Sequence, residues 1–265
     1  MRTHDFYEPR VSVVHQSDAR VKVILTLAFI LAINLLPPGT WANYLLFLSL
    51  IFSAEILSRL GIGYHLKRSL LALPFVLAAL PLLFTLPSPY HSIPIFGVNL
   101  QISQPGLERF LSIAVRSWIS IQAAILLAAS TRFPDLMIAL RMLKIPPIFV
   151  AIISLMWRYL FVIIEEATRL ERARSSRSGA APYGSARPGG RVWWRAKVTG
   201  GMVGNLFLRS LERSDRIYAA MLSRGYNGNP PTATIAPLNR QETLTIVLGL
   251  LTFLFLLFTG LTLGV

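Results

Sequence analysis

Cysteine is absent from the 265 residues of this chain, which excludes disulfide bonds and thiolate metal sites. Charge is scarce as well, because only 14% of the residues are charged, against about 25% in an average soluble domain. Acidic side chains are the rarer sign, at 12 against 26 Lys and Arg. Hydrophobic residues make up 54% of the chain and the mean hydropathy is +0.56, so the composition predicts a membrane protein. In such a protein a basic excess is typical of cytoplasmic loops.

The residue patterns of enzymes and metal sites are also missing. No two histidines have the i,i+4 spacing of a helical metal site, and the glycines lack the lysine spacing of a Walker-type phosphate loop. An intramembrane enzyme would need paired Asp, His or Ser at membrane depth, where Glu55 is poor support. The sequence therefore predicts no enzyme, no metal site and no cofactor. The histidines are scattered, at His4, His15, His65 and His91.

Long apolar runs are what the chain does have. A helix needs about 20 residues to cross a bilayer, with a lower limit of about 17. The polar N-terminal tail does not have the pattern of a cleavable signal, so the first run is expected to be retained as a membrane anchor. The six runs are Val21–Leu36, Tyr44–Leu57, Leu70–Leu86, Leu111–Ser130, Pro147–Ile164 and Thr243–Leu263.

The distribution of positive charge predicts the topology. Basic and nearly neutral loops alternate through the first four runs, which predicts a cytoplasmic N-terminus. Between Glu165 and Gly225 there are 12 Lys and Arg against 5 Asp and Glu, the most basic region of the chain. We therefore expect Pro147–Ile164 to stay on the cytoplasmic side or along the membrane, and Thr243–Leu263 to cross outward. The alternative has six spans and places the basic region outside.

The expected fold class is an all-α membrane protein with about five transmembrane helices and long cytoplasmic amphipathic coupling helices. Residues 1–130 would form the tail and a four-helix transmembrane region. Residues 131–228 would form a cytoplasmic or interfacial coupling domain, and 229–265 a linker with the last span. Within the third loop, the alternating segment "SIPIFGVNLQIS" is weakly hairpin-like and is expected to cap the bundle.

A charged segment occurs twice in the basic region. "EEATRLERARSSRS", Glu165–Ser178, and "ERSDRIYAAMLSRG", Glu212–Gly225, share one frame. The matched positions are Glu165 with Glu212, Arg169 with Arg216, Leu170 with Ile217, Ala173 with Ala220, and Ser176-Arg177 with Ser223-Arg224.

Each copy has the properties of an exposed helix that ends in arginine. The Glu and Arg at the first two matched positions are spaced i,i+4, which supports an exposed helix. The small Ala173 and Ala220 leave a shallow place for a neighbouring helix. Glycine after the arginine, as at Gly225, favours a helix stop. A planar, permanently charged guanidinium at a helix end suits docking into an acidic groove of another protein.

These repeats resemble the paired Ala-Arg-Gly signatures of the transmembrane (T) component of energy-coupling factor transporters. The residues around them are most similar to the cobalt-type permease branch of that family. "QSDARVKV" resembles that family's N-terminal Asp-Pro-Arg-x-Lys, with Ala19 at the proline position. Ser176-Arg177-Ser178 stands for the first signature and Ser223-Arg224-Gly225 for the second. The resemblance covers nearly the whole chain, and its specific part is the coupling region.

The resemblance implies the partners and the place of the protein. Arg177 and Arg224 would dock into two ABC-type ATPase subunits, which hydrolyse ATP, and the helices would move a substrate-binding integral membrane subunit. The protein would be a multi-pass component of the cytoplasmic membrane of a bacterium or archaeon. Membrane lipids are expected contacts, because Trp193 and Trp194 beside basic residues favour the headgroup layer. Nucleic acid is not expected, because acidic residues interrupt the basic region.

Several alternatives remain at this stage. Cobalt is the solute that the resemblance favours, with nickel or a vitamin as alternatives. A basic membrane anchor or interaction protein without a transport role is the alternative function from another class.

Inside the membrane, Arg116 needs a partner, since a charge at the bilayer centre costs at least about 2.5–3.5 kcal/mol. Glu55 is the candidate partner for an intramembrane ion pair with Arg116.

Overall fold

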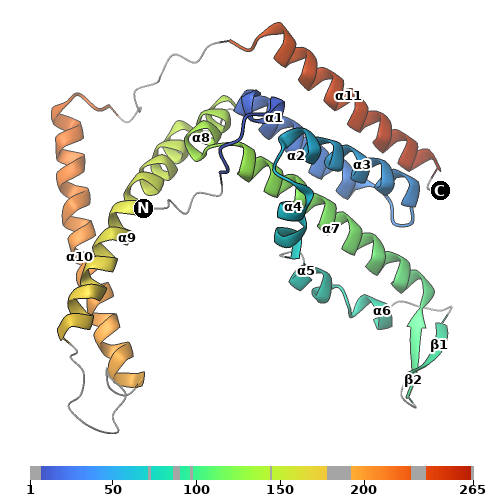
Figure 1. Cartoon of the computed structure of the whole chain (residues 1–265), viewed down its shortest axis with the longest axis horizontal. Coiled ribbons are helices and arrows are strands. Elements are labelled where there is room, and N and C mark those ends of the chain that lie inside the picture. The colour runs from blue at the N-terminus through green and yellow to red at the C-terminus, as the bar shows by residue number, and fades with distance from the viewer. Residues whose placement is uncertain are drawn as a thin grey trace. The chain divides into compact units, whose positions relative to one another are not determined.

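The computed structural model describes residues 7–70, 73–85, 90–95, 98–143, 145–177, 192–227 and 237–263. Helices dominate, with one two-stranded hairpin, so the predicted all-α membrane class is confirmed (Figure 1). The elements are α1 Val13–Gln16, α2 Ala19–Leu35, α3 Trp41–Ser58, α4 Ile62–Ser69, α5 Leu73–Ala78, α6 Leu82–Thr85, β1 Tyr90–Ile95, β2 Val98–Ser103, α7 Gln104–Ser130, α8 Phe133–Met142, α9 Pro147–Arg177, α10 Val192–Ser223 and α11 Arg240–Leu263.

The chain forms two compact units. Residues 1–142 and 236–265 make the first unit, and 143–235 make the second. Four helices among the described residues are long and apolar enough to cross a membrane, namely α3, α7, α9 and α11 up to Thr262. The apolar α2, with 17 residues, reaches the lower length limit of a span. The predicted division into 1–130, 131–228 and 229–265 concerns roles and stays a prediction.

The core of the first unit lies where α2, α3, α7 and α11 meet. Phe29, Phe47 and Phe253 pack there with ring centroids 5.2–6.3 Å apart. Asn43 of α3 donates a hydrogen bond of 2.7 Å to the Leu256 carbonyl of α11, a polar contact that holds two apolar helices in register. Many other leucines of these helices are exposed, which suits surfaces that face lipid.

The predicted third span, Leu70–Leu86, is wrong as a single helix. The described residues of that stretch form the short helices α5 and α6, with Pro74 in the first turn of α5 and Pro81 just before α6. A proline removes a backbone donor and breaks a helix interior, which accounts for the interruption. The segment still runs beside the first half of α7, because Trp118 donates a hydrogen bond to Ser69 and Gly106 packs against the Leu82 carbonyl (Figure 1).

The hairpin predicted in the third loop is confirmed. Strands β1 and β2 pair antiparallel, with Tyr90 opposite Ser103 and Ile95 opposite Val98. Residues 96 and 97, between the two strands, lie outside the described residues. Ser103 then caps α7 by accepting from the Gly106 amide. The role of the hairpin as a cap over the bundle stays a prediction.

Contacts within the first unit fix the directions of its helices. Lys22, at the start of α2, donates to the Ser130 carbonyl at the end of α7 over 2.9 Å, so these two ends lie together. Helix α11 runs parallel to α2, because Gly249 packs on Leu25 and Gly260 on Leu36. The chain therefore leaves the bundle of α2, α3, α7 and α11 after α7 and re-enters it at α11 on one and the same side, the side of the N-terminal segment.

Candidate functional site

The repeated helix ends predicted as docking sites are exposed in the structure. Arg177 is the last residue of α9, and Arg224 directly follows α10. Ser178 lies outside the described residues. The other residues predicted for docking or support are all at exposed positions: Glu165, Arg169, Ala173, Ser176, Arg177, Glu212, Arg216, Ala220, Ser223, Arg224 and Gly225.

The end at Arg224 is formed by a defined helix stop. Gly225 has φ +83°, and its amide donates to the Leu222 carbonyl over 2.9 Å. The Tyr226 amide donates to the Met221 carbonyl over 3.0 Å, which completes the six-to-one bond of a Schellman motif. Arg224 is therefore the cap residue of α10, and the chain turns away directly behind it. The predicted glycine stop at this position is confirmed.

The two repeats share a local hydrogen bond in the last turn. Ser176 donates to the Ala173 carbonyl over 3.0 Å, and Ser223 donates to the Ala220 carbonyl over 2.9 Å. In both copies the bond joins the matched serine to the matched alanine. This bond satisfies the hydroxyl inside its own helix and leaves the next residue, the arginine, at the end of the rod.

The predicted support within each helix is wrong in one respect. Neither Glu165–Arg169 nor Glu212–Arg216 forms an ion pair among the residues that the structure describes. The ion pairs run between the helices instead. The Glu166 carboxylate of α9 lies 3.3 Å from the Arg209 guanidinium and 3.5 Å from that of Arg213, both on α10. The side chain of Glu166 is only 16% exposed, because α10 covers it.

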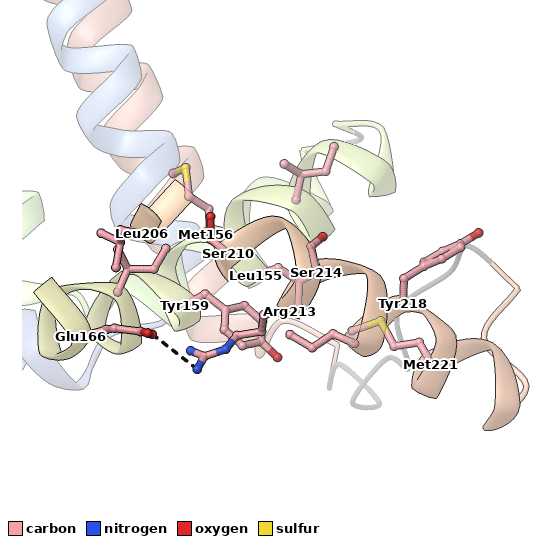
Figure 2. Close-up of a pocket in the computed structure, with 13 residues that line it drawn as sticks. Leu155, Met156, Tyr159, Glu166, Leu206, Ser210, Arg213, Ser214, Tyr218 and Met221 are labelled. Carbon is pink, nitrogen blue, oxygen red and sulfur yellow. Dashed lines mark ion pairs between the residues drawn. The ribbon is translucent and has the colours of Figure 1, made fainter. Parts of the chain in front are cut away.

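A mostly apolar cleft lies along the contact between α9 and α10 (Figure 2). Its volume is about 370 Å³, and Tyr159, Glu166, Leu206 and Arg213 are among the residues that line it. The residues that meet across it show that the helices run antiparallel. Glu166 meets Arg213, and Arg174, further along α9, donates to Thr199, nearer the start of α10, over 2.9 Å.

The contacts between the helices follow the frame of the repeat. Glu212 matches Glu165 forty-seven residues earlier, and the same shift relates Arg213 to Glu166. The helices thus meet at equivalent positions, which carry opposite charges. Shifting both members of the Arg174–Thr199 bond gives Met221 and Ile152, and these two residues line the same cleft. The α9–α10 pair therefore has an approximate two-fold relation, with one arginine at each end.

The same contacts bear on whether α9 lies in the membrane. The apolar part of α9 from Ile152 to Ile163 lines its cleft with residues 206–221 of α10. That part of α10 contains Arg209, Arg213 and Arg216 as well as two acids. If this part of α9 crossed the hydrocarbon layer, these charges would enter it too, at several kcal/mol each.

The predicted ion pair between Arg116 and Glu55 is wrong. Arg116 of α7 donates to the Tyr44 hydroxyl of α3 from Nε over 2.9 Å and from Nη2 over 2.6 Å. Glu55 lies about three turns further along α3 from Tyr44, fully buried, with its Oε2 4.0 Å from Nδ1 of the equally buried His65. Tyr44 was not foreseen, because no spacing in the sequence indicates which side chain faces Arg116 across two helices.

The described residues contain no group of three or more His, Asp or Glu side chains that could hold a metal ion. Glu55, His65 and Gln122 are among the largest fully buried polar side chains of the first unit.

Comparison with known proteins gives one family and several distant relatives. The profile of the family CbiQ, described as a cobalt transport protein, matches residues 10–235. The chain is 25% identical to the energy-coupling factor transporter transmembrane protein EcfT of Lactococcus lactis subsp. cremoris, over 96% of each chain. It is 27% identical to the cobalt transport protein CbiQ of Rhodobacter capsulatus over 47% of each chain. With the uncharacterized protein MJ1089 of Methanocaldococcus jannaschii it shares 28% identity over 52% of this chain and about half, 48%, of that relative.

Proposed function

Because the chain belongs to the CbiQ family of cobalt transport proteins, we propose that it is the transmembrane coupling subunit of an energy-coupling factor importer. In that role it passes the movement of ATPase subunits to a substrate-binding membrane subunit. ATP hydrolysis belongs to the ATPases, and this chain is a transport component rather than an enzyme. The observation that carries the proposal is the approximate two-fold relation of the α9–α10 pair, with Arg177 and Arg224 exposed at its opposite ends.

Two equivalent ends suit two equivalent partners. An ATPase of the ABC type works as a pair of subunits around a two-fold axis, and a two-fold arrangement of docking residues matches such a pair. Each guanidinium would enter an acidic groove, where charge complementarity fixes the register of the complex. Closing of the pair on ATP would then move both ends of the α9–α10 unit together.

The cytoplasmic side is the proposed location of this unit. The chain leaves the bundle of α2, α3, α7 and α11 and re-enters it on the side of the N-terminal segment, so residues 131–239 cross the membrane an even number of times or not at all. If α9 crossed, α10 would have to return, and α10 carries seven charged residues along 32 positions. We therefore propose that neither crosses, that the N-terminus is cytoplasmic and that the protein sits in a prokaryotic cytoplasmic membrane.

Cobalt is the proposed solute of the complex, on the description of the family that matches. The relative named EcfT is similar over nearly its full length and its name contains no metal. Nickel or a vitamin is therefore the second candidate. Uptake of labelled Co²⁺ and Ni²⁺ by cells that express the complete complex, with the substrate-binding subunit identified by mass spectrometry, tests this choice.

The test of the docking role is a double charge reversal, Arg177→Glu with Arg224→Glu, in the full chain expressed with its ATPases. The ATPase pair should no longer co-purify with the membrane-inserted variant. Arg240→Glu, which changes the same charge at an exposed position at the start of α11, is the matched control and should leave the complex intact. Normal ATPase recovery with the double variant would overturn the docking role.

A further inference from the structure

The approximate two-fold relation of the α9–α10 pair breaks down beside the arginine ends. At the Arg177 end, α10 begins with Val192 and continues with two indoles, Trp193 and Trp194. The forty-seven-residue shift takes these two positions to Pro146 and Pro147, at the start of α9. The same shift takes Arg195 and Lys197 to the apolar Ile148 and Val150. The Arg177 end therefore adds two indoles and two cations to its arginine, whereas the first turn of α9 at the Arg224 end offers Ile148 and Phe149, 57% and 56% exposed, without a cation.

The two indoles lie close to Arg177. Thr199 accepts the hydrogen bond from Arg174, so the last turns of α9 lie beside the first turns of α10. At 1.5 Å per residue, Arg177 lies about 4.5 Å beyond that bond along α9, and Trp193 about 9 Å beyond it along α10. Arg177 and Trp193 therefore lie at the same end of the unit, and one partner protein can contact both.

The indoles take no part in the contact between the helices. At 3.6 residues per turn, Trp193 and Trp194 project about 120° and 140° away from Thr199, which faces α9. Their exposed fractions are 82% and 48%. Trp and Arg are the residues in which the binding energy of protein interfaces is concentrated. Two exposed indoles in water are unfavourable, and docking removes their apolar area from water.

We infer that Trp193 and Trp194 form, together with Arg177, a composite anchor for one of the two ATPase subunits, so that the two ends of the unit bind their ATPases unequally. The inference rests on the proposed function, because it takes the ATPase as the partner. The arginine supplies direction and register, and the indoles supply apolar contact area. The Arg224 end has no indole, and its apolar contribution comes from Ile148 and Phe149 at the start of α9.

The test measures ATPase affinity for the full chain in nanodiscs by biolayer interferometry. Trp193→Ala with Trp194→Ala should lower the affinity at least tenfold, the loss expected for truncating interface tryptophans. Phe207→Ala removes an exposed aromatic ring, 61% accessible, from the middle of α10 and should change the affinity less than twofold. An unchanged affinity for the tryptophan variant, with a loss for Arg177→Glu, would overturn the anchor and leave the docking role standing.

Two further outcomes are distinct. If the wild-type chain binds no ATPase, the proposed function falls and the anchor with it. The other reading of the indoles is a lipid contact, and it is separated by fluorescence. The fluorescence that Trp193 and Trp194 contribute is the difference between the wild type and the double Trp→Ala variant. While ATPase is bound, brominated phosphatidylglycerol should not quench this contribution. Quenching that persists with ATPase present would mean that the indoles lie in the headgroup layer, and would overturn the anchor.

Discussion

Glu166 of α9 lies 3.5 Å from Arg213 of α10, and the two residues occupy the same position of the repeated segment (Figure 2). Arg177 follows Glu166 by eleven residues, and Arg224 follows Arg213 by eleven. At 1.5 Å per residue each arginine is thus about 16 Å from the crossing, in opposite directions. The ion pair is the centre of the second unit.

A charge swap at this centre should be tolerated better than either single change. Glu166→Arg places a third cation beside Arg209 and Arg213 and should open the contact between α9 and α10. Adding Arg213→Glu restores one opposite pair, worth about 0.5–1 kcal/mol at a partly exposed site. The chain has no cysteine, so two cysteines can be introduced at Ile152 and Met221, which line the cleft. The yield of their crosslinking then measures the contact between α9 and α10.

The control for this cycle is Arg216→Glu, an equal change on α10 at an exposed residue outside the ion pair. Its crosslinking yield should match that of the wild type. If the swapped protein crosslinks no better than Glu166→Arg alone, the ion pair does not hold the helices at their crossing.

A topology reporter between Gly189 and Gly190 should be cytoplasmic. This position follows α9, so it reports directly whether α9 crosses the membrane. A reporter in the short turn between α2 and α3, after Gly39, should be external and provides the control. Alkaline phosphatase activity at Gly189 would mean that α9 crosses the membrane, and it would place Arg177 outside, away from any ATPase.

The N-terminal segment should loosen in weak acid. His15 lies 2.7 Å from the Ser12 hydroxyl and 3.1 Å from the Glu8 carbonyl, which suits a neutral ring that accepts from Ser12 and donates to Glu8. Burial lowers the pKa of His15 below its ordinary value of 6.5. When the N-terminal segment is detached from the helices, its His15 takes up a proton at a higher pH than when the segment is packed. The packing of this segment therefore weakens as the pH falls from about 6.5 toward the lowered pKa.

Hydrogen exchange measures this effect at the Glu8 amide, which donates to the Ala129 carbonyl over 3.0 Å. After correction for intrinsic rates, its protection should be greater at pH 7.5 than at pH 5.5. His15→Gln keeps a donor toward Glu8 without a titrating ring, so its protection should be equal at the two values. A wild-type protection that rises in acid would contradict the assignment.

Hydrophobic runs and turn residues carried much of the fold. The runs at Val21–Leu36, Tyr44–Leu57, Leu111–Ser130 and Thr243–Leu263 became α2, α3, α7 and α11, because a long apolar stretch without proline has few other structures open to it. Leu70–Leu86 was assigned by its apolarity alone. Its two prolines, which divide it into short helices, were the available signal for the interruption.

Pairing across helices was beyond the sequence. Arg116 was matched with Glu55 because a buried cation calls for an acid, yet the hydroxyl of Tyr44 is what the packing of α3 on α7 brings to it. Local spacing likewise favoured Glu165–Arg169 over the pair that forms from Glu166. The repeat itself contained the missing information, since shifting Glu166 by one repeat gives a residue of opposite charge, Arg213.

The contact between α9 and α10 extends along both helices. They meet at Glu166–Arg213 and again at Arg174–Thr199, eight residues or about 12 Å further along α9. Because two separate contacts fix the angle between the helices, a force on Arg177 or Arg224 would turn α9 and α10 together. In the proposed function, a movement of the ATPases would therefore reach the start of each helix as a rotation of the pair, whose size depends on the displacement and on the arm length of about 16 Å.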